Sequence, residues 1–157
     1  MTRLRGRALR GVRVHASAPY GHWQTTTMIS SIRLDGSTAC MTINGPTDTE
    51  GFRTYVRCVL APTLRCGDVL VMDNLSPHKS ELTLGLIAQA GVQVLFLPPY
   101  SPDLNPIEKM WSKIKQLLRS AEARTEEELL RAIGAALASV TAQDAMNWFA
   151  SCGYSFI

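Results

Sequence analysis

Two runs of apolar residues, Val69–Met72 and Val92–Leu97, constrain the fold of this chain more than any other feature. Each run is followed by a polar, turn-forming segment. A strand without polar alternation is typical of a parallel sheet that is covered on both faces. A helical segment from Pro77 to Ala90, closed by Gly91, lies between the runs. The sequence therefore predicts a strand–helix–strand unit with a right-handed crossover.

An antiparallel hairpin is predicted ahead of this unit. Trp23–Leu34 is rich in β-branched residues, Asp35-Gly36 is typical of a tight turn, and Ser37–Asn44 returns as a second strand. The pattern T-x-x-E from Thr47 to Glu50 fits a capping box, so we expect a helix from there to Pro62.

Three helices are predicted in the last third of the chain. Asn105 is a favourable N-cap residue with Pro106 after it, a second capping box begins at Thr125, and a short helix is expected around Asp144–Ala150. The residues expected to be buried in the first two are Ile107, Met110, Trp111, Ile114, Leu117, Leu118, Leu129, Leu130, Ile133, Leu137 and Val140. We expect one mixed α/β domain over residues 1–157.

Two acidic residues are the candidate metal ligands. Asp73 directly follows the first apolar run, and Glu108 is the third residue of the helix after the second run. Because sites in open α/β sheets lie beyond the carboxyl ends of the strands, we expect the two acids to converge. Such oxygen ligands select Mg²⁺ or Mn²⁺. Two such ions about 3.5–4 Å apart can assist both oxygens of a phosphodiester cleavage.

Each of these residues also fits a simpler role. Asp73 with Asn74 can form a turn after a strand, Glu108 can belong to a capping box headed by Asn105, and His78 can pack at a helix start. Their joint position at one sheet edge is what favours the metal site.

Cationic residues are candidates for contact with a phosphate backbone. Residues 1–34 contain six arginines and no acid, whereas the remainder carries ten bases and thirteen acids. A solvated terminus, or cations that complement a helix dipole, are the alternatives. The candidates are Arg3, Arg5, Arg7, Arg10, Lys115 and Arg119, of which the last two share a helix face with Glu108.

The cysteines indicate a reducing compartment. Cys40, Cys58, Cys66 and Cys152 lack C-x-x-C spacing and lie in apolar segments, so we expect buried free thiols rather than a zinc site. The apolar runs are interrupted by proline or charge, so no membrane span is expected. We therefore expect a cytoplasmic protein.

Two segments resemble a known family. V-M-D-N-L-S-P-H-K and L-P-P-Y-S-P-D-L-N-P-I-E-K-M-W are similar to the second and third blocks of Asp-Asp-Glu (DDE) transposases of the mariner-type superfamily. Within it, bacterial insertion-sequence transposases resemble the chain most. R-G-x-A-x-R-G near the start, and G-H-W-x-T-T-T at residues 21–27, extend the resemblance over most of the chain.

The resemblance implies a ribonuclease H-like fold, a two-metal site and DNA transposition. Water, and then a DNA 3′-hydroxyl, would attack phosphodiesters. Asp73 and Glu108 match the second and third family acids, Asn105 would position the helix that carries Glu108, and Asn74 and His78 would support the ligands. The implied partners are transposon ends, target DNA and a second copy of the chain, in the bacterial nucleoid.

One family feature is missing. The first family acid lies on a strand ahead of R-G-x-A-x-R-G, and no carboxylate precedes Asp35 here. We therefore expect an N-terminally truncated core without that strand and without the upstream helix-turn-helix region. Nuclease activity of this chain by itself should be weak or absent. The alternatives are a non-catalytic DNA-binding module, and a fragment that binds a partner through an open sheet edge.

Overall fold

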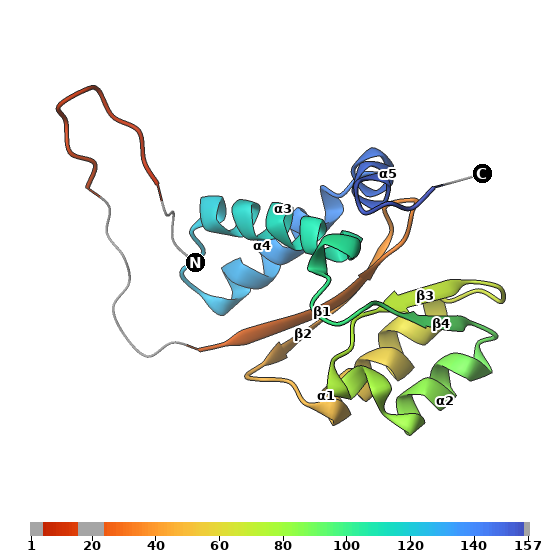
Figure 1. Cartoon of the computed structure of the whole chain (residues 1–157). Coiled ribbons are helices and arrows are strands. Elements are labelled where there is room, and N and C mark those ends of the chain that lie inside the picture. Colours follow the sequence, from red (N-terminus) through yellow and green to blue (C-terminus); the bar gives the residue numbers. More distant parts are fainter. Residues whose placement is uncertain (1–4, 16–23, 156–157) are drawn as a thin grey trace.

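The computed structural model describes residues 5–15 and 24–155. Its first sheet is the predicted hairpin, in which β1 (Thr26–Ile32) pairs antiparallel with β2 (Thr38–Asn44), from Thr26 opposite Asn44 to Ile32 opposite Thr38 (Figure 1). In the turn, the Asp35 carboxylate accepts hydrogen bonds from the amide and hydroxyl of Ser37, at 2.9 and 2.6 Å. The hairpin prediction is confirmed.

The second sheet is the predicted parallel pair. β3 (Val69–Met72) pairs with β4 (Gln93–Phe96), and the two pairs of strands form separate sheets within the described residues. The expected helix between them is divided into a 3₁₀ turn (Ser76–Lys79) and α2 (Glu81–Gln89), because Ser80 has an extended backbone with ψ of 126°. The mixed α/β class is confirmed, and within the described residues the hairpin and the parallel pair do not hydrogen-bond to each other as the one mixed sheet of a ribonuclease H-like fold would require.

One helical segment lies between β2 and β3 along the chain. α1 (Thr49–Tyr55) continues into a π-helical turn (Val56–Leu60) and a 3₁₀ turn (Ala61–Thr63). The predicted cap is off by one residue: Asp48 is the N-cap, and its carboxylate accepts the Gly51 amide hydrogen at 2.9 Å.

The C-terminal helices are α3 (Pro106–Ala121), α4 (Glu126–Ala138) and α5 (Ala142–Ser151). The capping box headed by Thr125 is confirmed, and Thr141 with Asp144 forms a second one that begins α5 earlier than expected. Asn105 occupies the N-cap position of α3, but its side chain makes no capping hydrogen bond.

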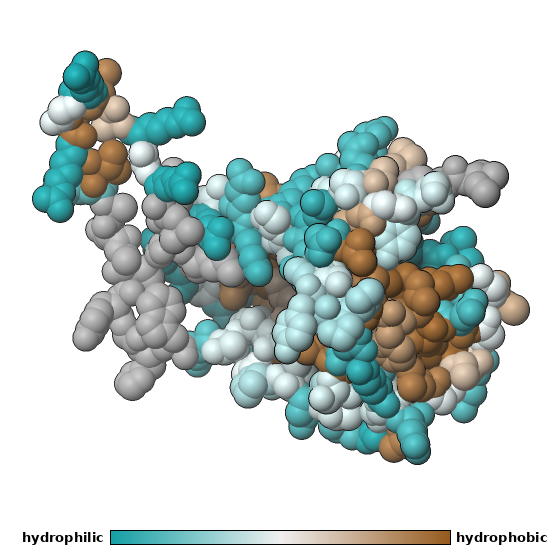
Figure 2. Space-filling view, in the orientation of Figure 1, coloured by the Kyte–Doolittle hydropathy of each residue, from teal (hydrophilic) through white to brown (hydrophobic). Residues whose placement is uncertain are grey.

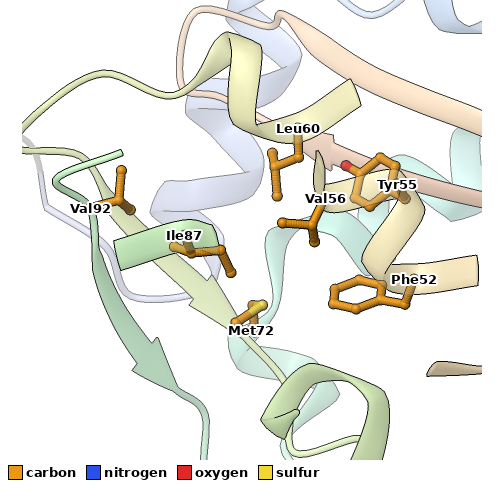
Figure 3. Packing of buried hydrophobic residues seen from close by; sticks show 7 residues of the cluster. All are labelled: Phe52, Tyr55, Val56, Leu60, Met72, Ile87 and Val92. Carbon is orange, nitrogen blue, oxygen red and sulfur yellow. The ribbon is translucent and has the colours of Figure 1, made fainter. Parts of the chain in front are cut away.

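Two apolar clusters lie on opposite sides of the hairpin (Figure 1). The first joins α1, its π turn, α2 and the parallel strands, and consists of Phe52, Tyr55, Val56, Leu60, Met72, Ile87 and Val92 (Figure 3). The second joins α3 and α4 against β1, and consists of Met110, Ile114, Leu118, Ile133 and Ala136. Leu117 and Leu130, which were expected to be buried, are 38% and 42% exposed, because each lies at the edge of its helix stripe.

Further burial predictions are wrong. The parallel strands are not covered on both faces: Val69 and Leu95 are 56% and 52% exposed, and Figure 2 shows an apolar patch over β3 and β4. The reason is that α2 covers one face and that alternate residues of β4 point to the other. All four cysteines are free, but Cys58 and Cys66 are exposed rather than buried. No helix among the described residues is long and apolar enough to cross a membrane.

Candidate active site

The structure places Asp73 and Glu108 beside the same hollow of the surface. Asp73 is the first residue after β3, and Glu108 lies in the first turn of α3. Both residues line a cavity of about 400 Å³ that extends between β1 and β3, and both line a second cavity of about 400 Å³ beneath the loop that joins β4 to α3. Two acids from distant parts of the chain therefore line the same two cavities.

The Asp73 carboxylate has a defined orientation. Its Oδ1 lies 2.7 Å from Nδ1 of His78 and accepts the Leu75 amide hydrogen at 3.2 Å. The His78 ring packs on Phe52, with 4.3 Å between ring centroids. Because Phe52 belongs to the first apolar cluster, this contact connects the acid to the core through a single imidazole.

Asn74 and Asn105 stabilise the backbone next to the two acids. The side-chain amide of Asn74 donates a hydrogen bond to the Leu97 carbonyl, and the backbone amide of Leu97 donates to the Met72 carbonyl at 2.8 Å. The ends of β3 and β4 are thus joined next to Asp73. The Glu108 amide donates to the Asn105 carbonyl at 3.1 Å, so the Asn105 backbone starts the helix that carries the acid.

Lys115 is exposed and Arg119 is half-buried, on the α3 face that begins with Glu108. Lys113, on the same helix, does not join them: its ammonium donates to Asp144 and to the Ser139 carbonyl, both at 2.7 Å. This ion pair, together with the Thr141 hydrogen bonds, lowers the pKa of Asp144 to about 2.

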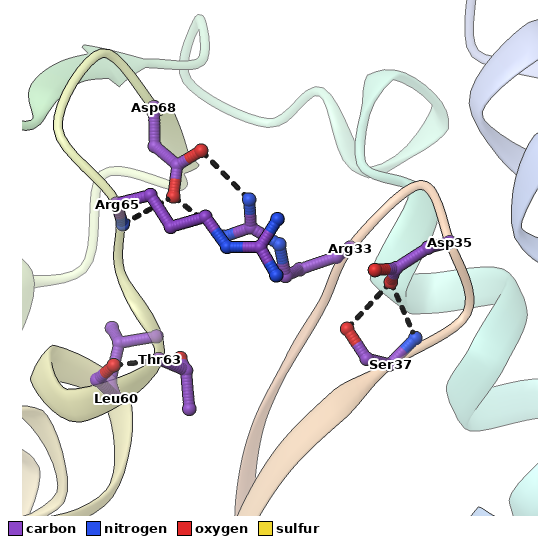
Figure 4. Close-up of polar contacts among 7 residues, drawn as sticks. All are labelled: Arg33, Asp35, Ser37, Leu60, Thr63, Arg65 and Asp68. Atoms are coloured by element: carbon purple, nitrogen blue, oxygen red, sulfur yellow. Dashed lines mark hydrogen bonds and ion pairs between the residues drawn. The ribbon is translucent and has the colours of Figure 1, made fainter.

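The N-terminal arginines lie apart from the acids. Arg5, Arg7 and Arg10 are exposed in the arm of residues 5–15, which extends away from the helices and sheets (Figure 1); Arg3 lies outside the described residues. Arg33 is not available for phosphate, because both of its terminal nitrogens bind Asp68 (Figure 4).

Tyr100 lies beside the candidate site and was not among the residues predicted from the sequence. Its side chain is fully exposed, its φ is 57°, and it lines the second cavity together with both acids. A left-handed backbone is unfavourable for a bulky residue, so the neighbouring loop must hold it in place. The sequence feature that could have revealed it is an aromatic residue between two prolines, Pro99 and Pro102, in a segment whose other residues are explained by turn formation.

The donor chemistry suits a hard divalent cation, but the number of donors is small. Carboxylate oxygens are the ligands that Mg²⁺ and Mn²⁺ prefer. Within residues 5–15 and 24–155, no group of three or more His, Cys, Asp or Glu side chains is arranged to hold a metal ion. Asp73 and Glu108 are therefore two candidate ligands, and the described residues supply no third acid, His or Cys to complete a group of three.

Comparison with known proteins identifies the family to which the chain belongs. The family model described as DDE superfamily endonuclease matches residues 1–130, so the chain belongs to the DDE superfamily of endonucleases. A segment of 50 residues is 46% identical to the human histone-lysine N-methyltransferase SETMAR. That segment is 32% of this chain and 7% of the human protein, so the similarity covers a small part of either.

Proposed function

We propose that this chain is a catalytic core of a mariner-type transposase, of the kind found in bacterial insertion sequences, with a ribonuclease H-like fold. It would cleave DNA phosphodiesters and transfer strands. The observation that supports this most is the shared cavity: Asp73, oriented by His78, faces the same space as Glu108. Family membership implies a DNA substrate for such a pair of acids.

Mg²⁺ or Mn²⁺ is the proposed cofactor, held by Asp73 and Glu108. When bound, such an ion lowers the pKa of attacking water and stabilises the leaving oxygen. The chain's own residues have separate tasks. His78 keeps the Asp73 carboxylate turned toward the cavity, and Lys115 and Arg119 attract DNA phosphates along α3.

The nicking activity of this chain alone should be weak, because two carboxylates hold a divalent ion less well than three. The test is nicking of supercoiled DNA in Mn²⁺, together with Mn²⁺ binding followed by electron paramagnetic resonance. Asp73→Ala and Glu108→Ala should each abolish nicking and weaken Mn²⁺ binding at least tenfold. Asp103→Ala, which removes a nearby exposed acid, is the control and should behave like the unmodified chain. Equal Mn²⁺ binding by all four proteins would reject the site.

The second candidate is a non-catalytic DNA-binding module. The exposed arginines of the arm favour it, because phosphate contacts need no metal. DNA affinity in EDTA should then fall steeply with salt, with a slope of roughly −0.9 per phosphate contact. Replacing Arg5, Arg7 and Arg10 together by alanine should reduce that slope. A DNA affinity that is unaffected by the three alanine substitutions would exclude the arm as a DNA contact.

Dimer formation on DNA is a further proposal, testable by light scattering.

A further inference from the structure

The backbone ahead of α3 is held by a side chain that follows α5. The hydroxyl of Tyr154 donates a hydrogen bond to the backbone carbonyl of Leu104, 50 residues away in sequence, at 3.1 Å. Leu104 closes the 3₁₀ turn Pro102–Leu104, and α3 begins two residues later with Glu108 in its first turn. This hydrogen bond therefore acts on the backbone immediately ahead of one of the two candidate acids.

Backbone hydrogen bonds connect this turn to the first turn of α3. The Asn105 amide donates to the Pro102 carbonyl at 3.1 Å. The Asn105 carbonyl in turn accepts the Glu108 amide hydrogen, also at 3.1 Å. Because the Asn105 side chain makes no capping hydrogen bond, the position of the helix start depends on the turn before it.

The end of α5 directs the Tyr154 side chain. The Gly153 amide donates to the Ala150 carbonyl at 3.0 Å, and Gly153 has φ of +89°. The Tyr154 amide donates to the Phe149 carbonyl at 3.1 Å. These bonds form a Schellman motif, which brings the side chains of Phe149 and Tyr154 together. Their rings pack edge to face with centroids 5.5 Å apart, so the Tyr154 ring is oriented by its own helix end.

α5 is also attached to the body of α3. The Lys113 ammonium, in α3, donates to Asp144 in the first turn of α5 and to the Ser139 carbonyl ahead of it, both at 2.7 Å. Ala145 of α5 is completely buried. Contacts from α5 and its end thus hold α3 in its middle, through Lys113, and ahead of its start, through Tyr154.

Tyr154 lies beside the candidate site. It lines the cavity of about 400 Å³ that Asp73 and Glu108 also line. Burial raises the pKa of the Tyr154 hydroxyl, which is therefore protonated and can donate at neutral pH. Since the hydroxyl is bound to Leu104, its effect on the site passes through the backbone.

We propose that Tyr154 is a positioning residue for the candidate site: its hydroxyl fixes the Leu104 carbonyl, and thereby the helix start that sets the place of the Glu108 carboxylate. The part of this inference that concerns a divalent ion rests on the proposed function. The family model matches residues 1–130, so Tyr154 lies beyond the matched segment. A helix outside that segment thus controls the geometry of a candidate acid within it.

Two tyrosine-to-phenylalanine variants of the full chain test the proposal. Tyr154→Phe keeps the ring and removes the hydroxyl. Tyr55→Phe is the matched control, because the Tyr55 hydroxyl also donates to a backbone carbonyl, that of Ala39, at 3.0 Å. Each variant loses a tyrosine hydrogen bond, but the second one lies between α1 and β2. Far-UV circular dichroism and thermal unfolding verify that both variants fold.

Hydrogen exchange without metal reports on the helix start. In Tyr154→Phe, exchange at the Asn105 and Glu108 amides should become about fivefold faster, the factor expected from the loss of one ordinary hydrogen bond. The Leu129 amide, in the first turn of α4, should not change. The control variant should leave all three amides unchanged. Unchanged exchange at Asn105 and Glu108 in Tyr154→Phe, or an equal change in the control, would overturn the proposal.

Mn²⁺ binding, followed by electron paramagnetic resonance, reports on the acid. Tyr154→Phe should weaken binding roughly tenfold, and Tyr55→Phe should not weaken it. In a Glu108→Ala background, Tyr154→Phe should cause no further loss, because an effect that passes through Glu108 disappears with it. A further loss of the same size in that background would show a general effect on the fold and would overturn the proposal.

The same measurements separate this inference from the proposed function. If the unmodified chain binds no Mn²⁺ but the two amides respond as expected, the role of Tyr154 at the helix start is supported and the proposed function fails. If Asp73→Ala weakens Mn²⁺ binding while Tyr154→Phe changes neither exchange nor affinity, the inference fails and the proposed function stands. If exchange responds but a measurable Mn²⁺ affinity does not, Tyr154 supports the fold alone and does not position the acid.

Discussion

Arg33 and Asp68 form a bidentate ion pair, with Nη1–Oδ2 and Nη2–Oδ1 distances of 2.6 and 2.7 Å. Asp68 also accepts the Arg65 amide hydrogen at 2.8 Å. The hydrogen bond from Arg33 is the main reason that the pKa of Asp68 falls to about 2, and the pKa of Arg33 is raised in return. The pair joins the end of the hairpin to the start of the parallel strands (Figure 4).

The first prediction concerns acid stability. Because the pKa of Asp68 is lowered in the folded state, its contribution is complete above the ordinary Asp pKa of about 4 and is lost as pH falls toward about 2. Asp68→Asn should flatten the pH dependence of the unfolding free energy in that window. Since Asp144 has a similarly lowered pKa, Asp144→Asn should flatten it too, and the double variant should flatten it further. Urea unfolding from pH 2 to 6 measures this.

The second prediction compares two glycines with similar backbones. Gly36 has φ of +84°, and a Cβ there would lie 2.7 Å from backbone atoms of Thr141 and Ala142. Gly45 has φ of +95° and open space around it. Gly45→Ala should cost about 1 kcal/mol from backbone strain alone. Gly36→Ala should cost clearly more in thermal unfolding, because the turn must move off α5. Equal costs would mean that this contact is not maintained in solution.

The third prediction tests the first apolar cluster. Ile87 is completely buried beside Val56 and Met72, whereas Leu82 on the same helix is 65% exposed. Ile87→Ala should reduce the unfolding free energy by about 2–5 kcal/mol, from lost burial and a cavity. Leu82→Ala should change it by less than about 0.5 kcal/mol. Chemical denaturation measures both, and similar losses would place Ile87 outside the core.

The fourth prediction concerns the support of Asp73 by His78. His78→Ala should lower Mn²⁺ affinity or nicking roughly 10–100-fold, because the carboxylate loses its orienting partner. His15→Ala, in the exposed arm, is the matched control and should have no effect on Mn²⁺ binding. A His78 variant with normal Mn²⁺ affinity would show that Leu75 alone is enough to orient the acid.

The fifth prediction uses Tyr100. An exposed aromatic ring beside the acids offers a stacking surface for an unpaired base, which is worth roughly 1–3 kcal/mol. Tyr100→Ala should therefore weaken binding of single-stranded DNA, and Tyr100→Phe should not. Leu75→Ala, an exposed apolar change near the same site, is the control. Fluorescence anisotropy measures all three, and unchanged affinity in the alanine variant would exclude stacking.

Local chemistry predicted most of the elements. The Asp35-Gly36 turn and the Thr125 capping box act over a few residues, and both are present in the structure. The N-cap of α1 was misplaced because Thr47 and Asp48 both carry a suitable oxygen, and only the backbone geometry selects Asp48. Which of two neighbouring residues caps a helix depends on small differences in backbone conformation that the sequence pattern does not reveal.

Long-range contacts were the part that sequence patterns could not provide. Arg33 was counted among the six arginines of residues 1–34 as a possible phosphate contact, yet it binds Asp68, 35 residues away. Val69 and Leu95 looked like core residues, yet their exposure depends on which layers cover the strands. The proximity of Asp73 and Glu108 to one cavity was anticipated from strand order, whereas the packing of His78 on Phe52 was not.

Successive residues of β1 serve different clusters: Met28 and Ile32 pack with α3 and α4, and Ile29 packs with α1 and the parallel strands. A shift of β1 by one position would turn every one of these side chains to the wrong layer. Misregistered forms would thus lose both hydrophobic assemblies at once. The correct register of the hairpin is therefore stabilised by burial on both of its faces.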